Sequence, residues 1–362
     1  MKVLAALSGG VDSAVAAARA VEAGHDVTAV HMALSSSSQE SRCGSRGCCT
    51  IEDKSDAARA AAMLGIPFYV WDLADTFEKT VVDDFLAEYR AGRTPNPCVR
   101  CNEFVKFREL LERGLMLGFD AVATGHYAKM IDGVNGPELH RGECYDKDQS
   151  YVLAVMGRDA LDHVLFPLGD AMTKADVRAE AERRGLPMSE KPDSYDICFI
   201  ADGDTSGFLR SRLGSEEGHI VDVEGKVLGT HQGAYAFTVG QRKGLRIERP
   251  AADGRPRYVL GTDMATNTVI VGAQELLSVN HIECDNAVLL VENDHPGLAG
   301  KEVTIQYRAH GQEVPAQVTY REGGFDVSLL RDTRAVASGQ SLVVYDGTHV
   351  LGQATITRAY RQ

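Results

Sequence analysis

The sequence predicts an α/β protein in which a helix-covered parallel sheet is followed by a small mixed domain and a C-terminal β-barrel. Over the first 203 residues, short apolar stretches alternate with helical ones, which is the pattern of a parallel sheet with crossover helices. Beyond that point the chain has short strands, many glycines and few helical periods. From about residue 279, apolar and polar residues alternate in evenly spaced pieces. We therefore divide the chain into residues 1–203, 204–278 and 279–362.

The composition indicates a cytoplasmic protein of two or three domains. Its 362 residues are 44% hydrophobic, yet no apolar run approaches the roughly 20 residues that cross a bilayer. Met1 and Lys2 lead directly into the first predicted strand, which leaves no room for a signal peptide, so we expect no membrane partner. The formal net charge of −13 disfavours a generic nucleic-acid-binding protein, and any RNA would have to be bound by local basic patches.

The elements of the first domain follow from apolar periodicity and from glycine and proline breaks. Residues 3–7 form an apolar run that predicts the first strand, and an Ala-rich helix follows it and ends before Gly24. The next elements expected along the chain are a strand over 27–32, a helix over 52–64, a strand over 66–71, a helix through 77–89, a proline break at 95–97, a helix over 103–117, a strand over 120–124, a hairpin over 133–150, a helix over 173–184 and a return toward the sheet over 193–200.

A glycine-rich turn, SGGVDS at residues 8–13, separates the first strand from the first helix. Paired glycines let the backbone approach a phosphate closely, and the free N–H groups and dipole of the helix start favour its negative charge. Asp12 could hold a metal ion and Ser13 could donate a hydroxyl, while a plain capped helix start is the alternative. Met32 and Gly125 also fall at the carboxyl ends of predicted strands, so we expect them to share one crevice with the turn.

The string SGGVDS resembles the PP-loop of the ATP pyrophosphatases, which have an adenine nucleotide alpha hydrolase-like fold. Members of that superfamily bind ATP and release AMP and pyrophosphate. Neither of the other two common phosphate loops, GxxxxGKS/T and GxGxxG, occurs in the chain, so no rival phosphate loop competes with this interpretation.

Eight cysteines in a cytoplasmic chain indicate catalysis, metal binding or redox chemistry rather than a disulfide scaffold. Cys98 and Cys101 form a CxxC pair near a helix start, where the helix dipole and Arg100 favour a thiolate. Half of a zinc site, a redox pair and part of an iron–sulfur site all stay open for this pair. Cys198 lies at the edge of an apolar run, where a buried, inert cysteine is the alternative. Cys43, Cys48 and Cys49 could bind metal, relay sulfur or have no role, and Cys144 and Cys284 are expected to be structural.

Several motifs occur together and in a fixed order along the chain. They are SGGVDS, Gly-Cys-Cys at 47–49, GRTPNPCVRCN at 92–102, ATGHYA at 123–128, DKDQSY at 146–151, the segment around Cys198, FTVGQRKGL at 237–245 and SGQ at 338–340. With this ordered set the chain resembles the bacterial tRNA-specific 2-thiouridylases over nearly its whole length. The resemblance implies a PP-loop domain, a small central domain and a C-terminal barrel. It also implies conversion of the wobble uridine of the tRNAs for Lys, Glu and Gln to 2-thiouridine.

The resemblance further implies a set of roles. ATP and Mg²⁺ would serve to adenylate the 2-carbonyl oxygen of the base. Cys198 would carry a persulfide delivered by a sulfur-donor protein, such as a cysteine desulfurase or a relay protein. Cys101 would be the second catalytic thiol and would resolve onto Cys198 as a disulfide. The phosphates would be held by Ala6, Leu7, Ser8, Gly9, Gly10, Val11, Asp12 and Ser13, and the adenosine by Met32 and Gly125.

One position departs from the best-known form of the family. Cys98 stands where many members have Asp as a proposed general base, which puts that carboxylate role in doubt. Three thiols, Cys98, Cys101 and Cys198, could then hold a labile [4Fe-4S] cluster with one open iron, as in related tRNA thiolases. Persulfide chemistry and a cluster are both retained as hypotheses for the sulfur source.

The tRNA contacts implied by the resemblance fall in the first domain and in the barrel. They comprise Asn96, Pro97 and Cys98 in the base pocket, His126, Asp148, Gln149 and Ser150 beside it, and Tyr307, Arg308 and Gln340 in the barrel. A structural histidine is the alternative for His126. Two basic concentrations could bind phosphates or could be solvated faces. The first contains Arg90, Arg93, Arg100, Lys106 and Arg108, and the second Arg242, Lys243, Arg246, Arg249, Arg255 and Arg257.

Three other functions compete with this one. A PP-loop ligase or amidating synthetase acting on a small acid would explain the glycine turn but leave Cys98, Cys101, Cys198 and the barrel without a role. A non-catalytic RNA-binding or redox-sensing module would release no pyrophosphate from ATP. A tRNA cytidine 2-thiolase would share the ATP and cysteine chemistry and differ in the target base.

Overall fold

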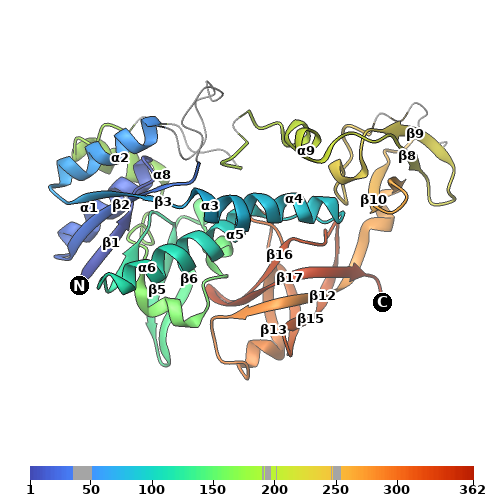
Figure 1. Cartoon of the computed structure of the whole chain (residues 1–362). Helices are drawn as coiled ribbons and strands as arrows, with labels where there is room; N and C mark the ends of the chain where they lie inside the picture. The colour runs from blue at the N-terminus through green and yellow to red at the C-terminus, as the bar shows by residue number, and fades with distance from the viewer. Residues whose placement is uncertain (36–50, 190, 192–196, 201, 246, 248–253) are drawn as a thin grey trace.

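The computed structural model describes residues 1–35, 51–189, 191, 197–200, 202–245, 247 and 254–362. Figure 1 shows the helix-covered sheet of the N-terminal part on one side of the molecule, the barrel below and the small central domain on the other side. Five of the residues singled out from the sequence lie outside the described residues, namely Cys43, Cys48, Cys49, Arg246 and Arg249.

The N-terminal part is built on a five-stranded parallel sheet of order β3-β2-β1-β4-β7, which confirms the predicted fold class. Residues of β1 alternate between two apolar cores because successive side chains of a strand point to opposite faces. Val3 and Ala5 face one core, and Leu4 and Ala6 face the other. The strands are β1 (Lys2–Ala6), β2 (Asp26–Ala33), β3 (Phe68–Asp72), β4 (Ala121–Ala123) and β7 (Val164–Leu165), the last of which the sequence analysis missed.

Helices cover both faces of this sheet (Figure 1). The first core takes in the Ala-rich face of α1 with residues of α2 and α8, and the second takes in residues of η2 and α6. The helices of this part are α1 (Val11–Glu22), α2 (Ile51–Leu64), α3 (Ala74–Phe77), the π-helix η1 (Glu78–Val82), α4 (Asp83–Arg90), α5 (Pro97–Arg100), the π-helix η2 (Cys101–Leu110), α6 (Leu111–Met116), α7 (Ser150–Leu153) and α8 (Lys174–Arg183), with 3-10 turns η3 (Tyr145–Lys147) and η4 (Arg158–His163).

The helix that carries the CxxC motif begins earlier than predicted. The expectation was a helix from about residue 103, with both cysteines on a loop before it. The structure instead starts the helix at Pro97 and continues it without a break through η2 and α6. The side chain of Asn96 caps this start by accepting hydrogen bonds from the N–H groups of Cys98 (3.1 Å) and Val99 (3.4 Å). Both cysteines therefore belong to the first turns of the helix.

The C-terminal barrel is closed, as predicted, because its first strand also pairs with its last strand. Six strands take part in the order β12-β15-β14-β13-β16-β17. They are β12 (Ser278–Leu289), β13 (Ala299–Gln306), β14 (Val314–Arg321), β15 (Gly324–Arg334), β16 (Ser341–Asp346) and β17 (His349–Tyr360), and a 3-10 turn, η7 (Pro296–Leu298), precedes β13.

A hairpin of the N-terminal part joins the barrel sheet. It consists of β5 (Ala128–Gly133) and β6 (Gly136–Arg141), so it begins about five residues earlier than expected. Its second strand pairs with β17 at His140 and His349, and the N–H of Arg141 donates to the carbonyl of Thr348 at 2.9 Å. The hairpin thus extends the barrel sheet to eight strands.

The central domain has a four-stranded sheet of order β10-β11-β8-β9 around a small apolar core. The domain is joined to the N-terminal part through α9, which packs against α4 around Phe85 and Leu209. Its elements are α9 (Thr205–Leu213), β8 (Gly218–Val221), β9 (Val227–His231), η5 (Ala234–Ala236), β10 (Tyr258–Asp263), β11 (Thr268–Gly272) and η6 (Gln274–Leu277).

Two further expectations concern the end of the first domain and the membrane. Of the segment 193–200, which was expected to return toward the sheet, residues 197–200 are described. They form a turn that packs near α4 and α9 and do not form a strand.

In the described part of the chain, every helix is too short or too polar to cross a bilayer.

Candidate active site

In the glycine turn after β1, one position, Gly9, requires glycine because of both its backbone conformation and its close neighbours. Gly9 has a φ of +82°, and a Cβ there would lie 2.3 Å from the carbonyl oxygen of Asp53 at the start of α2. The Ser13 hydroxyl donates to the carbonyl of Gly10 (3.0 Å) and accepts from the N–H of Ser8 (3.1 Å), which holds the turn in shape. Among the described residues no side chain caps α1 at Gly10, so N–H groups of its first turn face the turn.

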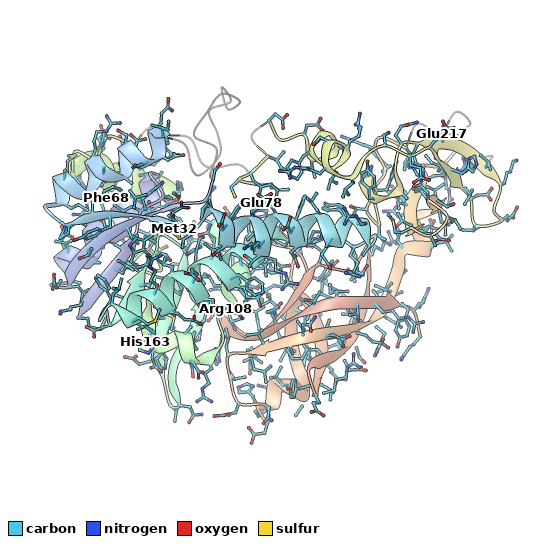
Figure 2. The ribbon with its side chains drawn as sticks, in the orientation of Figure 1. Met32, Phe68, Glu78, Arg108, His163 and Glu217 are labelled. Carbon is cyan, nitrogen blue, oxygen red and sulfur yellow. The ribbon has the colours of Figure 1, made fainter. Side chains whose placement is uncertain are left out.

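Met32 and Gly125 lie at the same edge of the sheet as this turn, as the sequence predicted. Figure 2 shows Met32 where the carboxyl end of β2 meets the start of α3. Gly125 follows β4, and a Cβ at this position would lie 2.6 Å from the N atom of Ser13. The absence of a side chain at Gly125 therefore lets the end of β4 approach the start of α1. Their predicted contact with adenosine stays a prediction.

Two lysines that sequence reasoning missed converge on the glycine turn. Lys174 forms an ion pair with Asp12, whose other carboxylate oxygen accepts from the Tyr127 hydroxyl at 2.8 Å. Lys191 donates to the carbonyl of Gly9 at 3.1 Å and to Asp53 at 2.7 Å. Both lysines are far from these partners in the sequence, and nothing in a single sequence signals such a pairing.

The charge of Lys191 is stabilised by its partners. Burial alone would lower the pKa of Lys191, but hydrogen bonds to Asp53 and Asp56 outweigh burial and raise it. The ammonium is therefore charged at neutral pH and lies beside the turn. Lys174 and Lys191 thus bring two ammonium groups to the glycine turn, where carboxylates of Asp12, Asp53 and Asp56 pair with them.

Cys101 and Cys198 pack against the same apolar cluster, formed by Leu73, Phe77, Val81, Val82 and Val105. Met32 packs against this cluster as well, so the two cysteines lie close to the edge of the sheet that carries the glycine turn. Both are partly buried, whereas Cys98 is exposed. No disulfide joins two of the five described cysteines. Cys144 and Cys284, which were expected to be structural, are buried.

The three cysteines proposed as cluster ligands are not gathered tightly. Cys98, Cys101 and Cys198 are all described, and their sulfur atoms do not all lie within 4.8 Å of one another. A single ion could not be held by all three thiols in this conformation. The iron–sulfur hypothesis therefore depends on the larger span of a four-iron cluster and stays a prediction.

Arg100 forms ion pairs with two neighbouring carboxylates. Its guanidinium contacts Asp84 at 3.3 Å and Glu103 at 2.8 Å. Burial raises the pKa of Asp84 against the opposing effect of Arg100. Arg93 is likewise paired with Glu88. The first basic concentration is thus partly neutralised. Arg90, Arg93 and Arg108 are its exposed members, and of these Arg93 is paired with a carboxylate.

His126 is buried rather than open to solvent. Its ring packs between Phe107 and Phe166, Nδ1 lies 2.7 Å from the Thr124 hydroxyl, and Nε2 lies 3.2 Å from Nζ of Lys106. Burial, with a smaller effect of the Lys106 charge, holds the pKa of His126 well below its usual range. The imidazole is therefore neutral at physiological pH. Contact of this side chain with tRNA would require Lys106 to move, so this role stays a prediction.

The segment 148–150 divides into buried and exposed positions. Asp148 forms an ion pair with Arg141 at 2.8 Å in which each side chain is 5% exposed, and the fully buried Ser150 donates to Asp148 at 2.7 Å. Gln149 is exposed, and its side-chain oxygen accepts from the N–H of Tyr127 at 3.1 Å. Of the three residues, Gln149 alone could touch RNA without rearrangement.

The pair of Arg141 and Asp148 continues into the barrel. Arg141 also donates to Gln306 at 3.0 Å, contacts Glu313 at 3.1 Å and lies over the ring of Tyr345. The hydroxyl of Ser150 lies 3.3 Å from that of Tyr345. This buried polar network was not anticipated from the sequence, and it joins the N-terminal part to the barrel.

Gln340 contacts the loop that precedes the CxxC helix. Its amide donates to the carbonyl of Thr94 at 2.7 Å, and the N–H of Thr94 donates to the carbonyl of Ser338 at 2.8 Å. The other two residues predicted from the barrel are held within it, since Tyr307 bonds to Thr333 and the exposed Arg308 donates to the carbonyl of Ala335. The barrel thus supports the loop that positions Asn96.

Three family profiles together match nearly the whole chain. They describe a tRNA methyl transferase HUP domain at residues 1–202, a tRNA methyl transferase PRC-barrel domain at residues 206–273 and an aminomethyltransferase beta-barrel domain at residues 280–356. Among solved structures, a 4-thiouridine synthetase–RNA complex with bound ATP matches 56% of this chain and 45% of that chain at 15% identity, with a TM-score of 0.36, which is too low to carry an argument.

Named relatives match the chain from end to end. It is 62% identical to the tRNA-specific 2-thiouridylase MnmA of Beutenbergia cavernae, over 100% of this chain and 96% of that protein. It is 58% identical to the protein of the same name from Streptomyces coelicolor, again over 100% and 96% of the two chains. The chain therefore belongs to the tRNA-specific 2-thiouridylase family.

Proposed function

We propose that the protein replaces the 2-oxygen of the wobble uridine in the tRNAs for Lys, Glu and Gln with sulfur, using ATP to activate the oxygen. The observation that carries this function is the meeting of two kinds of chemistry at one sheet edge. Met32, Cys101 and Cys198 pack against one apolar cluster, beside the glycine turn of residues 8–13. A nucleotide loop next to a pair of cysteines is what adenylation followed by sulfur transfer requires.

Activation comes first because a carbonyl oxygen is a poor leaving group. Transfer of the adenylyl group from ATP to the 2-oxygen releases pyrophosphate and turns that oxygen into part of a phosphate ester. The N–H groups at the start of α1 and the ammonium groups of Lys174 and Lys191 are suited to the phosphates. Mg²⁺, if bound beside Asp12, would neutralise phosphate charge, although that carboxylate already accepts from Lys174 and Tyr127.

Sulfur transfer follows in two balanced steps. The terminal sulfur of a Cys198 persulfide, loaded by a donor protein, attacks C2 of the base, and the C2–O bond breaks as AMP leaves. The Cys101 thiolate then attacks the Sγ atom of Cys198, the bond between the two sulfurs of the former persulfide breaks, and the 2-thiouridine is released. A disulfide between Cys101 and Cys198 remains, and a two-electron thiol reductant restores both thiols.

A [4Fe-4S] cluster is the second candidate for the sulfur source. Cys98 in place of an acidic residue supplies a third thiolate, and three cysteine ligands would leave one iron open for sulfide. The exposed position of Cys98 would suit a labile cluster. Iron and sulfide assays after anaerobic purification test this route, and an iron-free enzyme with full activity would eliminate it.

Nucleoside mass spectrometry tests the proposed function. tRNA is incubated with ATP, a sulfur source and wild-type protein, Cys198→Ser, Cys98→Asp or Cys144→Ala as the matched cysteine control. We expect Cys198→Ser to form no 2-thiouridine while pyrophosphate release from ATP and tRNA persists. Cys144→Ala should retain thiolation because Cys144 is buried in the core of the sheet.

The same experiment separates the alternatives. Retained thiolation by Cys98→Asp supports the persulfide route. Loss of thiolation by Cys98→Asp, together with iron bound to the wild-type protein, supports the cluster. If the product is 2-thiocytidine, the target base is cytidine and not uridine. Full thiolation by Cys198→Ser would contradict the mechanism proposed here.

A further inference from the structure

Two histidines and a glutamate meet where the hairpin of the catalytic part joins the barrel. Glu138 and His140 lie two residues apart on β6, so both side chains point to one face of the sheet. His349 begins β17 and is the register partner of His140 on the neighbouring strand. More than two hundred positions separate the two strands in the sequence, so spacing alone could not indicate this group.

The three side chains are close enough to share one ion. Nε2 of His140 lies 3.1 Å from Oε2 of Glu138, and Nδ1 of His349 lies 3.9 Å from the same oxygen. One ligand atom from each residue lies within 4.8 Å of the other two, and this is the one such group found in the described part of the chain. Ligand atoms about 2 Å from a zinc ion lie about 3–4 Å apart. The rings of His140 and His349 are stacked, with centroids 4.9 Å apart and planes 16° apart, so one ring must rotate before both nitrogens point at one ion.

The environment favours a ligand at this position. Nε2 of His349 is buried and has no hydrogen-bond partner among the described residues, a cost that a ligand would remove once the ring rotates to bring Nε2, rather than Nδ1, toward Glu138. Nδ1 of His140 lies 2.9 Å from the Thr348 hydroxyl, the outer partner that a metal-bound imidazole usually has. Gly133 makes room for the carboxylate, because a Cβ there would lie 2.0 Å from Oε1 of Glu138.

We propose that Glu138, His140 and His349 form a Zn²⁺ site that bridges β6 and β17. Two imidazoles and one carboxylate are a donor set that Zn²⁺ prefers, and the carboxylate supplies charge for a divalent cation. A pocket of about 370 Å³ adjoins Glu138 and His349, so water can complete the coordination. The ion would connect the catalytic part to the barrel at their shared strand pair.

His295 lies beside the site and is not one of its ligands. Its ring packs edge-on against His349 with centroids 6.2 Å apart. Its Nδ1 accepts a hydrogen bond from the N–H of Gly297 at 3.1 Å, so in the neutral ring Nε2 carries the proton. His295 therefore supports the orientation of His349.

Zinc binding by untagged, full-length protein tests this site. The accessible thiols are first alkylated with iodoacetamide so that the catalytic cysteines cannot bind zinc. Calorimetric titration with Zn²⁺ should give one bound ion per chain. Glu138→Gln and His349→Gln should each weaken the affinity by at least about a hundredfold, since even the loss of an outer partner costs about ten- to a hundredfold.

Controls keep the result specific. His163→Gln, a histidine outside the site, should bind Zn²⁺ like the alkylated wild type, and circular dichroism should show that each variant is folded. Co²⁺ bound in place of Zn²⁺ should show visible bands without the near-ultraviolet charge-transfer band of a thiolate ligand. No zinc binding after alkylation, or equal binding by folded Glu138→Gln and His349→Gln, would overturn the assignment.

Discussion

Gly9 and Gly24 are both left-handed glycines, but they differ in what surrounds them. Gly9 and Gly24 have nearly the same φ, +82° and +79°, but a Cβ at Gly9 would overlap the backbone of Asp53, whereas a Cβ at Gly24 would have no atom within 4 Å. The glycine turn is therefore held in shape by contact with α2 as well as by its own conformation. Substituting alanine at Gly24 tests the cost of a left-handed backbone alone, whereas the same substitution at Gly9 adds a steric overlap with α2.

Gly9→Ala should abolish detectable ATP binding and lower the melting temperature, because the turn and the start of α2 must move apart. Gly24→Ala should cost about 1–2 kcal/mol of unfolding free energy from its conformation alone and leave ATP affinity unchanged. Calorimetric ATP titration and thermal unfolding measure both effects. Equal ATP affinity in the two variants would show that the contact with Asp53 has no part in nucleotide binding.

At the scale of residues, local motifs were predictable and distant partners were not. The string at 8–13 indicated a phosphate turn because glycines, strand and helix are adjacent in the sequence. Lys174 and Lys191 reach the same turn from segments folded against it later in the chain. His126 was expected beside the RNA, and its burial depends on Phe107 and Phe166 from other elements.

Helices α1 and α8 are joined by ion pairs centred on Glu180. Arg19 contacts it at 2.6 Å and Arg184 at 2.8 Å, and the Glu180 side chain is 13% exposed. The hydrogen bond from Arg19, with that from Arg184, holds the pKa of Glu180 below its ordinary value of 4.5. The stabilisation is therefore complete above that value and is lost as the pH falls through the lowered pKa.

Glu180→Gln should reduce the unfolding free energy by about 1–2 kcal/mol near neutral pH. The difference from wild type should shrink as the pH falls below 4.5 and through the lowered pKa of Glu180, where this carboxylate becomes protonated. Glu182→Gln, which alters an exposed residue of the same helix, should change little at either pH. Urea unfolding at the two pH values measures this, and a pH-independent difference would contradict the role of the Glu180 charge.

The contact between residues 338–340 of the barrel and the loop before α5 can be tested with a second pair of glycines. Gly339 has a φ of +89°, and a Cβ there would lie 2.9 Å from Cβ of Arg93 and 3.0 Å from the N atom of Thr94. Gly347 also has a positive φ, +62°, and no atom lies within 4 Å of its Cβ position. Only the first substitution would move the loop that carries Asn96.

Gly339→Ala should slow single-turnover thiolation about ten- to a hundredfold, because a small displacement of a catalytic group is costly. ATP affinity should be unaffected, since the glycine turn lies on another element. Gly347→Ala should thiolate tRNA at the wild-type rate. Similar rates for the two variants would show that the barrel does not position the CxxC helix.

At the scale of elements, the helix starting at Pro97 was predictable although its start was placed six residues too late. Asn96 followed by Pro97 is a typical cap and first helical residue, and that signal outweighs the general tendency of proline to break helices. The π-helical segments had no such signal.

At the scale of the molecule, the acidic chain leaves few positive positions for RNA. Arg242 and Lys243 are exposed in the central domain, whereas Arg93 and Arg100 are held by carboxylates. Arg255 is 69% exposed and lies 3.6 Å from Glu275. We therefore expect Arg242 and Lys243 to supply more of the electrostatic attraction to tRNA than Arg93 and Arg100.

Replacing Arg242 and Lys243 with Gln should weaken tRNA binding and reduce the slope of log affinity against log salt by about 0.7–0.9 for each phosphate that the protein no longer neutralises. ATP binding should survive. Arg183→Gln, an exposed position on α8, is the matched control and should leave the slope unchanged. An unaltered slope in the double variant would exclude this surface from the RNA interface.

The order of domains could be predicted because composition and periodicity change along the chain. The contacts that hold the N-terminal part and the barrel together could not be predicted. The hairpin pairs with β17, and Arg141 reaches Gln306, through residues that are far apart in sequence. Alternation of apolar and polar residues predicts strands without saying which strands become neighbours. The closed barrel was expected, and the two added strands from the catalytic part were not.

The shared sheet between hairpin and barrel limits how this protein can be recombined. A chimera that joined the catalytic part to a different RNA-binding module would remove the partner of β6, the barrel residues that Arg141 binds and the support of Gln340 for the loop before α5. The barrel is therefore not an interchangeable appendage. A functional chimera between relatives must therefore take the N-terminal part and the barrel from the same parent protein.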